Sequence, residues 1–145
     1  MSIDTEAITL ILLVLLVGVS ALTDLWKGRV YNAVTVPGIL LGLALSAQRG
    51  GAEGILDVLC AVVFTIIFLF PFYSMRGLGA GDIKLLAAVS GFLPSKEYLL
   101  CFAGAFVIGA VCGVAGLVRT RGRVHKIHFA VPVAASVLMH LTGLF

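Results

Sequence analysis

Asp82 is the residue whose type and place point most directly to chemistry. It follows a glycine-rich stretch, residues 77–81, that lies between two long apolar runs. Its carboxylate is therefore predicted at a membrane boundary, where an ionisable side chain is costly and suggests a functional site. The glycines predict a backbone that takes conformations closed to other residues and that another chain can approach closely. What Asp82 does then depends on the group that it faces.

Asp24 is the candidate partner of Asp82. Two close carboxylates do not both ionise easily, so they tend to share one proton. The ionised group can take a proton from water, while the protonated group can hydrogen-bond to a peptide carbonyl and polarise it, as in aspartic proteases. This chemistry requires no metal and no other cofactor, and we expect none. Simpler roles stay open: Asp24 suits an interfacial charge beside Lys27 and Arg29. Asp82 suits a helix N-cap, with Lys84 extending to the membrane surface.

The elements that position these residues are predicted to be membrane helices. Of the 145 residues, 61% are hydrophobic and only 12% are charged, which is more apolar surface than a soluble domain of this size can bury. We expect one domain over residues 1–145, an all-α integral membrane protein that meets the lipid bilayer and no nucleic acid. About six transmembrane helices are predicted, over residues 7–23, 32–48, 55–73, 82–94, 97–118 and 128–145.

The basic residues predict the orientation in the membrane. With Lys84 counted in the third, the first, third and fifth loops hold eight of the ten Lys and Arg residues. Basic loops stay on the cytoplasmic side, so we expect a multi-pass protein of the cytoplasmic (inner) membrane with its N-terminus outside. Asp24 and Asp82 then lie at the same, cytoplasmic face. Residues 82–94 cover only about 20 Å as a helix, so this segment is expected to be shielded by its neighbours or to sit in a thinned bilayer.

Two motifs resemble those of the type IV prepilin peptidases, which are membrane aspartic proteases. Residues 79–88 read GAGDIKLLAA. This stretch resembles the GxGD signature of that family, in the form found in its small branch for tight-adherence (Flp) pili. The other family motif is an Asp just after the first span, followed by a basic stretch. Residues 24–32 read DLWKGRVYN, with Tyr31 where the family often has proline. The resemblance covers nearly the whole chain in span order.

The resemblance implies an enzyme, a prepilin peptidase. Such an aspartic endopeptidase removes the short basic leader from a prepilin at the cytoplasmic membrane face, just before the hydrophobic helix of the pilin. By analogy Asp24 and Asp82 are the catalytic pair, and either of them can be the base. The glycines would let an extended substrate lie against the backbone. The residues expected to bind substrate or shape the site are Gly79, Gly81, Lys84 and Asn32.

The cysteines bear on a second activity of the resembled family. Its larger bacterial members also methylate the new N-terminus, and they carry an added cytoplasmic segment with paired cysteines. Here Cys60, Cys101 and Cys112 all lie in apolar segments and form no CxxC pair. We therefore expect peptidase activity without methyl transfer.

The polar residues allow two other interpretations. The chain could be a non-enzymatic carrier or assembly subunit in which Asp24 and Asp82 bind protons or cations. Transporters place such residues near the bilayer midplane, whereas both are predicted at one face here, which favours the peptidase. His125 and His128 have a spacing that suits metal ligands on one helix face. The surrounding basic run, residues 119–126, is more simply interpreted as a patch for anionic lipid, so no metal site is predicted.

Overall fold

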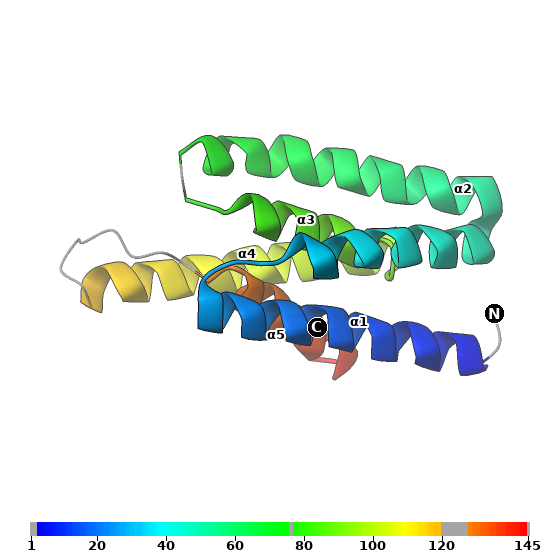
Figure 1. Cartoon of the computed structure of the whole chain (residues 1–145), viewed down its shortest axis with the longest axis horizontal. Coiled ribbons are helices and arrows are strands. Elements are labelled where there is room, and N and C mark those ends of the chain that lie inside the picture. The colour runs from blue at the N-terminus through cyan, green and yellow to red at the C-terminus, as the bar shows by residue number, and fades with distance from the viewer. Residues whose placement is uncertain (1–2, 76, 120–127, 145) are drawn as a thin grey trace.

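The computed structural model describes residues 3–75, 77–119 and 128–144, and all the regular secondary structure within them is helical. The helices run nearly alongside one another in an elongated bundle (Figure 1). Their bounds are Ile3–Lys27 for α1, Asn32–Ser74 for α2, Ala80–Ser90 for α3, Ser95–Arg119 for α4 and Ala130–Leu141 for α5. The predicted all-helical fold is confirmed for the described residues.

α2 is a helical hairpin. Gly51 lies inside it with φ 58° and ψ −131°, a conformation that favours glycine, and the chain doubles back there (Figure 1). Gly54 makes the turn tight, because a β-carbon at this position would lie 2.2 Å from the carbonyl oxygen of Ser46. The Ser46 hydroxyl also donates a hydrogen bond to the Gly54 carbonyl, 2.7 Å away. The six apolar segments thus correspond to six helical stretches, but the loop predicted between residues 48 and 55 is wrong, since helix continues on both sides of Gly51.

Three stretches of the described chain are long and apolar enough to cross a membrane: Thr5–Lys27, Asn32–Ser74 and Ser95–Gly116. α2 is about twice as long as the hydrocarbon core is thick, and it folds back on itself, so each half suits one crossing. Large apolar side chains on these helices are exposed, among them Ile67 and Val107. These features support a membrane protein, while the six crossings and their orientation stay predictions.

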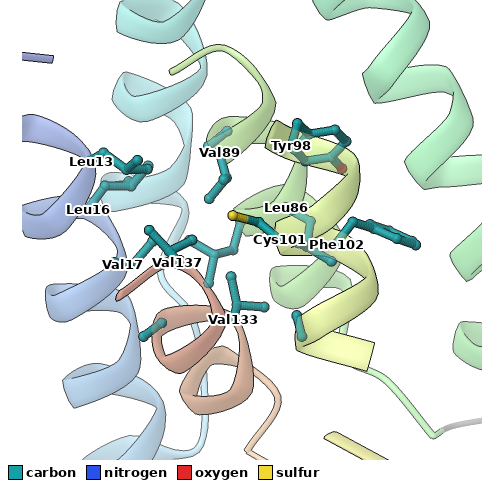
Figure 2. Packing of buried hydrophobic residues seen from close by; sticks show 14 of the residues in the cluster. Leu13, Leu16, Val17, Leu86, Val89, Tyr98, Cys101, Phe102, Val133 and Val137 are labelled. Atoms are coloured by element: carbon teal, nitrogen blue, oxygen red, sulfur yellow. The ribbon is translucent and has the colours of Figure 1, made fainter. Parts of the chain in front are cut away.

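α3 lies inside the bundle. The nine consecutive residues 85–93 are all buried. Figure 2 shows Leu86 and Val89 of α3 in the same cluster as Phe102 of α4 and Val133 of α5. Because this stretch meets protein rather than lipid, a helix of 11 residues can sit in a membrane that it is too short to cross. The expectation that neighbours shield the short fourth segment is confirmed.

The C-terminal end of α3 is fixed to the first half of α2. A β-carbon on Gly42 would lie 2.9 Å from the Cα of Gly91, so the two backbones touch. The Arg49 guanidinium donates hydrogen bonds to the carbonyl oxygens of Gly91 and Phe92, the second over 3.0 Å. These bonds satisfy carbonyls that the end of a helix leaves without partners. The position of α3 along the bundle is thereby set from the end opposite Asp82.

Candidate active site

Asp82 lies in the first turn of α3 and is 7% exposed. Its Oδ2 accepts a hydrogen bond from the backbone N–H of Gly79, 3.0 Å away. Gly79 is the N-cap of α3, so the alternative that Asp82 itself is the N-cap is wrong. Asp82 instead reaches back from the third helical position, where an acidic side chain is also favoured by the helix dipole. This bond orients the carboxylate toward the start of the helix.

Gly79 is required for space rather than for an unusual backbone. Its φ of −83° and ψ of 151° are open to any residue. Gly81 lies inside α3, so the expectation of special backbone conformations is wrong for Gly79 and Gly81. A β-carbon on Gly79 would lie 3.1 Å from Oδ2 of Asp82. A side chain at this position would therefore press on the carboxylate.

Gly81 joins the two motifs. A β-carbon on Gly81 would lie 2.9 Å from the β-carbon of Val30 and 3.1 Å from its carbonyl oxygen. Val30 belongs to the short connection between α1 and α2. The space that the missing side chain leaves is thus filled by this connection, which brings the end of α1 up to the start of α3.

Asp24 lies in the last two turns of α1 and is 4% exposed. Its Oδ1 lies 3.4 Å from Nδ1 of His128. Its Oδ2 is buried and has no hydrogen-bond partner among the described residues. The helix ends one turn later, where Gly28, with φ 61°, donates its N–H to the Asp24 carbonyl over 2.8 Å. A buried carboxylate with an unsatisfied oxygen is costly, and such a group calls for a functional explanation.

Asp24 and Asp82 line the same cleft, whose volume is about 1450 Å³. Gly79 and Gly81 line it as well. The other walls come from the loop after α1, the end of α2, α4 and the start of α5, and include Arg29, Tyr73, Met75, Gly109, Gly113 and His128. Four of the six predicted site residues therefore lie around one cavity.

Lys84 and Asn32 do not line this cleft. The Lys84 Nζ donates a hydrogen bond to Oδ1 of Asn32 over 2.9 Å, and both side chains are exposed. The bond links α3 to the first residue of α2. The structure thus brings these two residues together, with Lys84 two residues after Asp82 in α3, and their role toward substrate stays a prediction.

His128 is the cleft residue whose place the motifs did not reveal. In the sequence, His128 stands out only through its spacing from His125, which suits a metal ligand, and through the neighbouring basic run, which suits a lipid patch. His125 lies outside the described residues. The predicted topology does hold a signal for His128, because the loop before the last segment is assigned to the same face as Asp24. The predicted topology does not give the packing of α5 on α1, and this packing brings His128 to the Asp24 carboxylate.

Comparison with known proteins bears on what this cleft does. The sequence model of the type IV leader peptidase family matches residues 10–114. The chain belongs to the type IV leader peptidase family. The match holds both aspartates and the glycine-rich stretch between α2 and α3, and it ends before His128. Membership in the type IV leader peptidase family implies a protease and a prepilin as its class of substrate. Neither a search of curated proteins nor one of solved structures gave a match.

Proposed function

We propose that this chain is an aspartic endopeptidase of the cytoplasmic membrane that removes the leader from Flp-like prepilins, with Asp24 and Asp82 as its catalytic pair. The observation that carries the proposal is the placing of two buried carboxylates, Asp24 at 4% and Asp82 at 7% exposure, on one cleft in a member of this family. Asp24 lies near the end of α1 and Asp82 near the start of α3, and the charge distribution assigns both of these helix ends to the cytoplasmic face.

The reaction proposed for this pair divides two tasks between the carboxyl groups. The ionised carboxylate takes a proton from a water molecule, and the water oxygen attacks the carbonyl carbon of the scissile peptide bond. The protonated carboxyl donates its hydrogen bond to the carbonyl oxygen, which stabilises the charge that forms there. Collapse of the tetrahedral intermediate breaks the C–N bond, and a proton passes to the leaving amine. One group must be charged and one neutral, so the rate is expected to fall on both sides of an optimal pH.

The cleft suits a peptide next to an apolar helix. Along α4 it is lined by Gly113 and Gly116, small residues that let another backbone approach closely, and nothing lies within 4 Å of a β-carbon on Gly116. Tyr73 and Met75 line it from the end of α2. Gly79 and Gly81 have their space taken by Asp82 and Val30, so in this proposal the substrate strand runs along α4 rather than on the glycines of the motif.

The test is co-expression with a Flp-type prepilin. Asp24→Asn and Asp82→Asn are each expected to abolish the size shift that marks leader removal, while the protein stays in the membrane fraction. Asp57→Asn is the matched control, because Asp57 is exposed on the second half of α2 and does not line the cleft. Normal processing by either of the first two variants would show that the pair mechanism is wrong.

A further inference from the structure

The contact between His128 and Asp24 is the part of the site that the proposed mechanism does not yet use. The two side chains differ sharply in exposure: 38% for His128 and 6% for Asp24. The imidazole Nδ1 is 3.4 Å from the carboxylate Oδ1. The imidazole is therefore partly open to water although its Nδ1 is buried, and a charge on the ring acts on a carboxylate that water barely reaches. In such surroundings the interaction of two charges is stronger than at an open surface.

The packing of α5 holds His128 in this place. Its backbone carbonyl accepts the N–H of Val131 over 3.1 Å in the turn that begins α5. The next residue, Phe129, is 5% exposed and lies against α4, where a β-carbon on Gly109 would come within 2.7 Å of its ring. The ring of Phe106 also packs against Phe129, with centroids 6.0 Å apart and the ring planes at 70°. The backbone that carries His128 is thus held in place by the start of α5 and by the buried Phe129 next to it.

We propose that His128 is a positioning residue of the active site, whose protonated imidazole favours the ionised form of Asp24 and holds its orientation. This role rests on the proposed function. The two carboxylates then have separate neighbours, because Asp82 accepts a hydrogen bond from the N–H of Gly79, while Oδ1 of Asp24 faces the imidazole Nδ1 3.4 Å away. A nearby cation favours the charged form of a carboxylate, and an imidazole is charged on the acid side of neutrality. His128 would therefore extend activity toward low pH.

Other titratable groups on the cleft must be considered with His128. Within the part of the chain that the structure describes, they come from each surrounding element: Asp24 and Arg29 from α1 and its loop, Tyr73 from α2, Asp82 from α3 and Cys112 from α4. Arg29 and His128 are the two described cleft residues among these whose side chains can carry a positive charge, and His128 is the one that contacts Asp24.

The experiment is the pH dependence of prepilin cleavage by the full-length protein in detergent. For His128→Asn the acid limb of the kcat profile is expected to move to higher pH by about 0.5–1 unit, with KM unchanged. His128→Lys supplies a fixed cation and is expected to keep the acid limb of the wild type. His140→Asn is the matched control, because His140 faces Glu97 at the same 3.4 Å, between α5 and the start of α4 and away from the cleft.

Each outcome decides between the two proposals. If the wild type cuts and the Asn variant follows its profile, or if the Lys and Asn variants behave alike, the role of His128 is refuted and the proposed function stands. If the wild type does not cut the prepilin, the proposed function fails and the role of His128 fails with it. His128→Gln replaces the Asn variant if that one does not accumulate.

Discussion

Gly81 lies so close to Val30 that a β-carbon on the glycine would come within 2.9 Å of the valine β-carbon. The two residues are far apart in the sequence, one just before Asp82 and the other six residues after Asp24. Their contact fastens the motif of α3 to the connection that follows α1. Both carboxylates depend on this contact for their common cleft, and the first prediction concerns it directly.

Gly81→Ala is expected to lower kcat about 10- to 100-fold, because the added methyl group pushes the start of α3 away from Val30 and moves Asp82. Gly18→Ala is the control, since nothing lies within 4 Å of a β-carbon there. Cleavage rates are measured with purified proteins at equal concentration. A Gly81→Ala enzyme as active as the control would show that the contact does not set the geometry of the site.

Gly79→Ala separates catalysis from stability. The backbone at this position suits alanine, so the thermal midpoint in detergent should stay near that of the wild type. The methyl group would lie 3.1 Å from Oδ2 of Asp82, so kcat is expected to fall about 10-fold or more. Gly50→Ala, with open space at its β-carbon, is the matched control. Equal kcat values for the two variants would contradict the role assigned to Gly79.

Arg49→Gln tests the anchor at the far end of α3. Loss of the guanidinium leaves the carbonyl oxygens of Gly91 and Phe92 without their donor. The expected cost is about 2 kcal/mol of stability, because hydrogen bonds to charged groups are worth more than neutral ones. Thermal unfolding in detergent measures it, with the exposed Lys96→Gln as control. Equal midpoints for both variants would rule out the anchor.

The processed pilin should keep a free N-terminal amine. In this chain Cys60, Cys101 and Cys112 are free cysteines on helices, without the paired cysteines of the larger methylating enzymes that the sequence resembles. Mass spectrometry of pilin from cells that hold this protease alone would give the unmethylated mass. A mass higher by one methyl group would overturn the proposal of peptidase activity alone.

Much of the fold follows from the sequence because it is local. Uncharged apolar runs predict helices, and their boundaries agree with the structure to within a few residues. The sequence predicts the chain reversal in α2 but not its form. Gly51 alone reverses the chain, and the charged residues around it lie in helix rather than in a loop. Charge counts suggested a loop there because they do not distinguish a long loop from a one-residue turn.

The candidate site was predictable only in part, for a related reason. Asp24 and Asp82 stand out because a carboxylate at a membrane boundary is rare, and the cleft does contain both. The roles of Gly81 and His128 depend on their contacts: Gly81 lies against Val30, and His128 lies against Asp24. Such contacts arise from the packing of helices distant in sequence, and no local pattern encodes them.

The attachments of α3 also bear on how the cleft can open. At one end Gly81 rests on Val30, and at the other Gly91 rests on Gly42, so both ends are joined to the segment that contains the α1–α2 connection and the first half of α2. That segment therefore holds both ends of the helix that carries Asp82. On the other side of the cavity, α4 and the second half of α2 meet through aromatic rings such as Phe72 and Phe106. We expect the cavity to widen on this side if it has to widen for a polypeptide. Opening of the cavity is then expected to move α4 or the second half of α2 and to leave Asp82 in place.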